Sequence, residues 1–157
     1  MIFDLFEILG GEHAMECVFL IFVSLFFAIL FLQSGIDKII YFSDNLNYFK
    51  DHFKNTFLKN QVKSLLMFIT LIECVTGILF LLSIINLIKS GSDDGFAIIL
   101  NLETFYFPAL IFTFLTLCSL FLGQRIAQDY AGAVNLGIYF LIALIAFSLP
   151  VLFLELA

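Results

Sequence analysis

The chain has 157 residues, of which 62% are hydrophobic and only 13% are charged, and its mean hydropathy is +1.12. This composition excludes an ordinary soluble domain and indicates an integral membrane protein. The net charge of −6, with lysines that flank apolar segments, gives no support to nucleic-acid binding.

Four apolar segments are long enough to cross a hydrocarbon core of about 30 Å as helices. They are continuously apolar, whereas the strands of a membrane β-barrel would alternate in hydrophobicity. The sequence therefore predicts an all-α polytopic membrane protein, a single domain over residues 1–157 that forms an antiparallel four-transmembrane-helix bundle with short amphipathic interfacial helices. The predicted spans are about 15–42, 64–88, 105–122 and 131–154.

The positive charges are distributed asymmetrically between the two sides of the predicted bundle. Lys89 alone lies on one side, together with most of the acidic residues. By the positive-inside rule the other side faces the cytoplasm, which predicts an N-out/C-out, multi-pass topology. The cations on that side are Lys38, Lys50, Lys54, Lys59, Lys63 and Arg125.

Three connecting segments have helical or turn-like patterns of their own. Residues 44–60 place apolar side chains three or four positions apart with lysines between them, which predicts a basic interfacial helix. This helix either covers the cytoplasmic end of the bundle or contacts a specific lipid or partner. Met1–Leu9 is expected to be amphipathic, Gly91–Gly95 to be a turn, and Phe96–Glu103 to lie along the outer surface before Pro108 begins the third helix.

Glu73 is an ionisable residue in the middle of the apolar run Leu65–Ile88, about 12 Å along the helix from its first residue. Hydrocarbon makes such a group costly, so Glu73 is expected to face protein and to mark a functional site. We expect a neutral carboxyl, hydrogen-bonded to Thr70, a neighbouring helix or a quinone-like headgroup, unless Lys38 or Arg125 reaches it. Gly77, one turn away, allows a close helix approach.

A second group of polar residues is predicted at the cytoplasmic end of the bundle. We expect Asp37 to pair with Arg125 and Lys38 to pair with Asp129, since two acids and two bases at one membrane level offset the cost of charge near lipid. Whether these residues form a structural clamp or a functional site stays open, and no catalytic residue is assigned. The candidate functional polar cluster is Gln33, Asp37, Lys38, Glu73, Arg125 and Asp129.

Three stretches of the sequence resemble motifs of one known family. Residues 31–38, FLQSGIDK, are similar to the end of the first helix in the DoxX family, and residues 72–82, IECVTGILFLL, to its second helix. Residues 125–133, RIAQDYAGA, resemble the stretch that opens the last helix in some members. The motifs occur in the family's order and cover essentially the whole chain.

The resemblance to the DoxX family implies a four-helix protein of the bacterial inner (cytoplasmic) membrane with a redox-associated role. The wider group includes the membrane subunit of a thiosulfate:quinone oxidoreductase. We expect an accessory or scaffold subunit of a larger membrane redox or respiratory complex that is not an enzyme by itself, with other membrane subunits and lipids as partners. A quinone-interacting oxidoreductase subunit and a small-solute or proton transporter are the alternatives.

Cofactor and metal sites have little support in the sequence. The cysteines Cys17, Cys74 and Cys118 show no C-x-x-C spacing, so no metal site and no intrinsic cofactor is expected, with quinone as the one candidate ligand. His13 and His52 are predicted on opposite sides of the membrane, where each would be a solvated interfacial residue.

Overall fold

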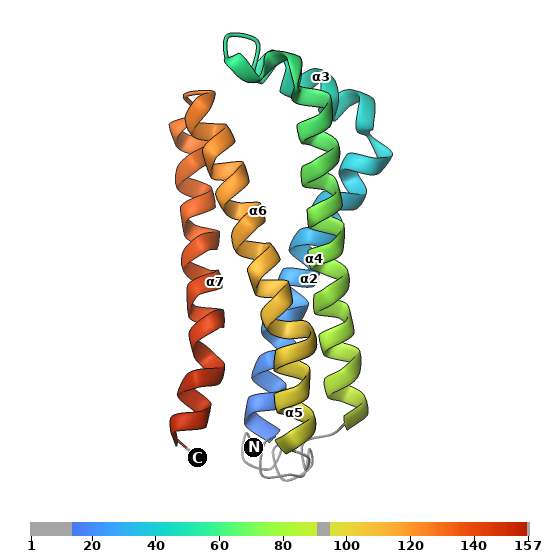
Figure 1. Cartoon of the computed structure of the whole chain (residues 1–157), viewed down its shortest axis with the longest axis vertical. Helices are drawn as coiled ribbons and strands as arrows, with labels where there is room; N and C mark the ends of the chain where they lie inside the picture. Colours follow the sequence, from blue (N-terminus) through green and yellow to red (C-terminus); the bar gives the residue numbers. More distant parts are fainter. Residues whose placement is uncertain (1–13, 91–94, 157) are drawn as a thin grey trace, which may run out of the picture.

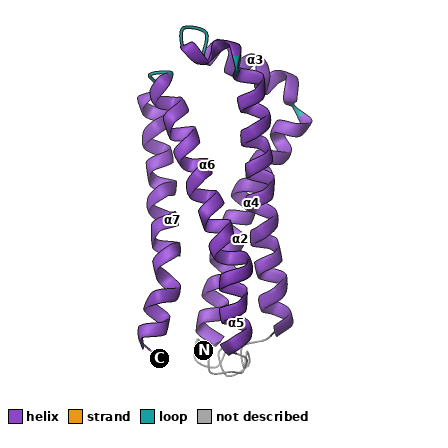
Figure 2. Cartoon of the chain, in the orientation of Figure 1, coloured by secondary structure: helices purple, strands orange, loops and turns teal. Residues whose placement is uncertain are grey.

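The structure, a computed structural model, describes residues 14–90 and 95–156, with side chains over 14–89 and 96–150. The predicted helix Met1–Leu9, the turn at Gly91–Asp94 and His13 lie outside the described residues. Helices make up almost all of the described chain, and no strand is present in it (Figure 2). Four helical stretches are long and apolar enough to cross a membrane: Ala14–Ile40, Val62–Lys89, Phe96–Ile126 and Tyr130–Pro150. The predicted all-α, four-span fold is thus confirmed.

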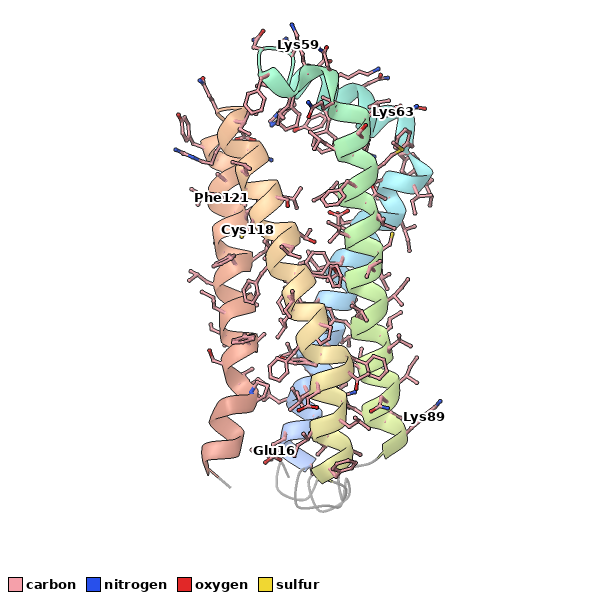
Figure 3. All side chains as sticks on the ribbon, viewed as in Figure 1. Glu16, Lys59, Lys63, Lys89, Cys118 and Phe121 are labelled. Atoms are coloured by element: carbon pink, nitrogen blue, oxygen red, sulfur yellow. The ribbon has the colours of Figure 1, made fainter. Side chains whose placement is uncertain are left out.

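Figure 1 shows how the helices follow one another along the bundle. The elements are α2 (Ala14–Ile40), α3 (Phe42–His52), η1 (Phe57–Asn60), α4 (Val62–Ser90), α5 (Gly95–Asn101), η2 (Leu102–Tyr106), α6 (Phe107–Ile126) and α7 (Tyr130–Leu156). The start of α2 and the end of α7 lie at the same end of the bundle. Lys59 and Lys63 lie at the opposite end from Glu16 and Lys89 (Figure 3). We call the end that carries Lys50, Lys54, Lys59 and Lys63 the lysine-rich end.

Two predicted element boundaries are wrong. The interfacial helix predicted at 44–60 is interrupted, because α3 ends at His52 and a separate 3₁₀ turn, η1, begins at Phe57. The side chain of Thr56 caps this turn by accepting a hydrogen bond from the Leu58 amide at 3.2 Å. The third span is longer than predicted, since α5 continues through the π-helical turn η2 into α6 and carries the segment predicted to lie along the outer surface.

The four spans do not pack equally. Helix α2 packs most extensively against α4, α4 packs against α6, and α6 packs against α7, whereas α2 and α7 barely touch. The buried core lies nearer the end where α5 is found, and aromatic rings hold it together. Phe27 stacks on Phe80 with ring centroids 5.2 Å apart, and Phe80 meets Tyr106 edge to face at 6.2 Å.

Two glycines bring α2 and α4 into close contact. A Cβ added at Gly77 would lie 2.5 Å from Leu32 Cγ and 3.0 Å from the Leu32 backbone nitrogen. A Cβ added at Gly35 would lie 2.7 Å from Cys74 Sγ. The contact is reciprocal, with each glycine receiving a side chain of the other helix, as small residues do in membrane helix pairs. The close approach predicted at Gly77 is confirmed.

One hydrogen bond joins the third and fourth spans where α7 contains a proline. Pro150 has no backbone N–H, so the carbonyl of Ala146, four residues earlier, lacks its helical donor. The buried Tyr106 hydroxyl donates to that carbonyl oxygen at 2.9 Å. In lipid an unpaired carbonyl is costly, and Tyr106 removes that cost.

Candidate functional site: an intramembrane lysine–glutamate pair

Ser34 and Lys38 lie four residues apart on α2 and therefore share a helix face, which the Gly35 contact turns toward α4. Lys38 Nζ donates to Ser34 Oγ at 2.6 Å, to the Ser34 carbonyl oxygen at 3.3 Å and to Glu73 Oε1 at 3.1 Å. Ser34 Oγ in turn donates to Glu73 Oε1 at 3.1 Å. The three side chains thus form a closed triangle between the first two spans.

The lysine–glutamate pair is almost fully buried between the helices. The exposed fractions of the side chains are 2% for Glu73 and 11% for Lys38, and Nζ lies 2.9 Å from Glu73 Oε2. The ammonium group thus lies within hydrogen-bond distance of both carboxylate oxygens of Glu73 and of the Ser34 hydroxyl, and more loosely of the Ser34 carbonyl oxygen. Pairing offsets the cost of charge inside the membrane, because neither group is left alone in a medium of low dielectric constant.

The structure decides between the partners expected for Glu73. Lys38 reaches the carboxylate, whereas Thr70 does not act as its partner, because the Thr70 hydroxyl donates to the Leu66 carbonyl oxygen of its own helix at 2.7 Å. Gln33 and Asp37 point away from this face of α2 and are exposed. Of the six residues of the predicted cluster, only Lys38 and Glu73 come together.

The two predicted ion pairs, Asp37 with Arg125 and Lys38 with Asp129, are wrong within the described residues. Arg125 instead lies over the Tyr130 ring, with its guanidinium carbon 4.7 Å from the ring centroid. Asp129 caps the start of α7, where its Oδ1 accepts a hydrogen bond from the Gly132 amide at 2.9 Å. These residues act locally in the connection between α6 and α7.

That connection has the geometry of a Schellman motif. Gln128 adopts a φ of 62°, the left-handed conformation typical of the residue after a helix C-cap. The Asp129 amide donates to the Gln124 carbonyl oxygen at 2.9 Å, and the Gln128 amide donates to the Arg125 carbonyl oxygen at 3.3 Å. The sequence RIAQDYAGA thus encodes a tight reversal that sets α7 antiparallel to α6.

The sequence did not predict a hydrogen bond at the lysine-rich end. His52, expected to be solvated, is half-buried, and its Nε2 lies 2.9 Å from Gln124 Oε1. Position 52 falls on the same face of α3 as Phe49 and Phe53, so the apolar period that predicted the helix also marks His52 as inward-facing. Both side chains line a cavity of about 310 Å³ between α3, η1, α4 and α6.

The sequence also did not predict the buried polar group of Asn101, which lies at the opposite end of the bundle. Its side chain is 1% exposed, accepts a hydrogen bond from Ser83 Oγ at 2.9 Å and donates to the Ser83 carbonyl oxygen at 2.9 Å. It also donates to Asn86 Oδ1 at 3.2 Å. Because every part of the amide has a partner on α4, this group fixes the start of the third span and leaves no donor for a ligand.

Over the described part of the chain, no three His, Cys, Asp or Glu side chains lie close enough together to hold a metal ion. Comparison with protein-family models, curated proteins and solved structures finds no match to this chain. The described part of the chain thus has four helices long and apolar enough to cross a membrane and a lysine–glutamate pair between the first two of them.

Proposed function

We propose that this protein is a non-catalytic accessory subunit of a larger membrane assembly. The observation that carries the proposal is the closed triangle of Ser34, Lys38 and Glu73. A proton relay or a ligand site would need the intramembrane carboxylate to face a water path or a cavity. Here Glu73 is 2% exposed, its Oε1 is held by two donors of α2, and it lines neither the cavity between α3, η1, α4 and α6 nor the groove between α2 and α7.

The last span offers the surface for a partner subunit. In the most apolar stretch of α7 only 17% of the residues are buried, whereas in the corresponding stretch of α4 the share is 44%. A Cβ added at Gly137 of α7 would meet nothing within 4 Å, and Asn135, two residues earlier and on another face of the helix, is exposed. A glycine with open space beside it suits close contact with another transmembrane helix, because small residues are favoured there.

The finer parts of the proposal rest on the motifs and the charge distribution. Residues 31–38, 72–82 and 125–133 resemble the DoxX family, which supports a redox-associated role in the bacterial inner membrane. Five lysines lie at or between the ends of the first two spans, and Arg125 lies in the connection on the same side, which supports an N-out/C-out orientation. The quinone-interacting alternative has less support, because Glu73 is 2% exposed and lines neither the cavity at the lysine-rich end nor the groove between α2 and α7.

Exchanging the two charges tests whether the pair is structural. In the double variant Lys38→Glu with Glu73→Lys, opposite charges still meet between α2 and α4, whereas either single variant places like charges together. We expect both single variants to lose folded protein and the exchange to recover at least half of it, measured as monodisperse protein after mild detergent extraction. Glu73→Gln removes the negative charge but keeps a side-chain oxygen that can accept from Lys38 and Ser34, so it should retain more folded protein than Glu73→Lys.

The same preparations, run on native gels, report the size of the assembly. Gly137→Leu should shift the protein to a smaller species without lowering its yield, while Leu115→Phe, a change of an exposed apolar residue on α6, should not. Failure of the charge exchange to rescue folding, or loss of turnover in an intact assembly that contains Glu73→Gln, would contradict the accessory role. The latter result would favour proton or quinone chemistry at Glu73.

A further inference from the structure

The cavity at the lysine-rich end has an almost wholly apolar wall. Its volume of about 310 Å³ is at the lower end of the range of small-molecule sites, roughly 300–1,000 Å³. The polar side chains in its wall are Ser119 and the hydrogen-bonded pair of His52 and Gln124. The apolar lining includes Phe49, Phe53, Phe57, Leu66, Ile69 and Leu120.

Four exposed lysines lie next to lining residues of this cavity in the sequence, and their charge is unpaired within the described residues. Lys50 and Lys54 directly follow the lining residues Phe49 and Phe53, while Lys59 and Lys63 lie next to the lining residues Leu58 and Val62. All four are exposed, and none has an ion pair or a hydrogen bond from its side chain within residues 14–90 and 95–156. An apolar cavity thus lies at the same end of the bundle as four lysines whose charge is unpaired within the described residues.

We propose that this cavity binds one acyl chain of an anionic phospholipid, whose phosphate is held by Lys50, Lys54, Lys59 and Lys63. An acyl chain would make apolar contacts with the wall of the cavity, and a phosphate would neutralise the lysines. Basic residues at the membrane surface attract anionic lipids in this way. A neutral headgroup such as a quinone would leave the four lysines without a counter-charge, and a soluble anion would leave the cavity unfilled. The site rests on the cavity and the lysines, and is independent of the proposed subunit role.

The test is a lipid titration of the purified, delipidated full chain, followed by native mass spectrometry. Phosphatidylglycerol and phosphatidylcholine with the same acyl chains serve as probes. We expect one phosphatidylglycerol to bind at least about tenfold more tightly than phosphatidylcholine, given the contribution of each lysine. Lys50, Lys54, Lys59 and Lys63 changed together to Gln should abolish this preference, whereas Lys89→Gln at the other end should keep it.

A matched pair of serine variants tests the cavity itself. Ser119 lines the cavity, and Ser148 on α7 lies away from it. Both serines are exposed, and each donates to the carbonyl four residues earlier, at 2.7 and 2.9 Å. Ser119→Phe should fill the cavity and weaken binding of both lipids about tenfold or more, a loss of roughly two buried methylene groups. Ser148→Phe should leave binding unchanged.

Three results would overturn the lipid site. The first is equal binding of the two phospholipids by the unaltered chain. The second is equal lipid affinity of the Ser119→Phe and Ser148→Phe variants, both shown to be folded by circular dichroism. The third is a neutral isoprenoid quinone that co-purifies in the cavity and is not displaced by phosphatidylglycerol.

Discussion

The pair formed by α2 and α4 and the pair formed by α6 and α7 are built by different means. In the first pair, glycines on both helices and a buried ion pair fix the helices at close range. In the second, Gly137 faces open space and the described hydrogen bond between the spans is that of Tyr106. The same fold thus contains one closely packed helix pair and one that leaves more surface free, and the second pair carries the face that we propose for a partner subunit.

The largest effect is expected where half of the ion pair is removed from the first helix pair. Glu73→Leu leaves Lys38 buried without a counter-charge and should destabilise the protein by about 3–5 kcal/mol. Adding Lys38→Met should recover most of this loss, because the double variant buries no unpaired charge. Unfolding by sodium dodecyl sulfate in mixed micelles measures both. A double variant as unstable as Glu73→Leu would mean that the hydrogen bonds of Ser34, not the charge balance, hold the helices.

An intermediate effect is expected from filling the glycine contact. Gly77→Ala forces Leu32 and its backbone away from α4 and should cost about 2–3 kcal/mol, as overpacking of a fixed contact does. Gly137→Ala on α7 is the matched control, and it should be neutral or stabilising by about 0.5–1 kcal/mol, because its methyl group meets open space and alanine favours the helix. Equal effects in the same unfolding assay would remove the distinction between the two helix pairs.

The smallest effect concerns the single hydrogen bond of the looser pair. Tyr106→Phe leaves the Ala146 carbonyl without a donor and should cost about 1–2 kcal/mol. In the background of Pro150→Ala, residue 150 regains an N–H for that carbonyl, so Tyr106→Phe should then cost less. A double-mutant cycle in mixed micelles measures the coupling. A coupling energy near zero between the two substitutions would show that the Ala146 carbonyl is not stabilised by the Tyr106 hydroxyl.

Hydropathy alone was sufficient to predict the four spans, because the apolar runs are long and uninterrupted. The same reasoning located Glu73 in the interior, where its cost requires a partner. The sequence did not identify that partner. Charged residues were paired by their depth in the membrane, and depth does not show toward which neighbour each helix face is turned. Phe27, Phe31 and Gly35 define the buried face of α2, and this face contains Lys38 but not Asp37.

The boundary errors have local physical causes. The break between α3 and η1 depends on the capping of the Leu58 amide by Thr56, a competition that the apolar period of residues 44–60 does not reveal. The third span begins early, because Phe96–Glu103 continues into the next helix and its Asn101 side chain is satisfied by Ser83 and Asn86 on α4. In each case the boundary involves a side-chain hydrogen bond that a hydrophobicity pattern does not reveal.

The separation of Lys38 and Glu73 by 35 positions, in successive spans, has a consequence for biosynthesis. A charged residue at a helix centre raises the cost of partitioning a segment from the translocon by about 2.5–3.5 kcal/mol, and Glu73 lies deep in α4, whereas Lys38 lies in the last turn of α2. When α4 emerges, α2 has already been made and its ammonium group can meet the new carboxylate. The two segments should therefore enter the bilayer together, as a hairpin, before α6 and α7 are synthesised.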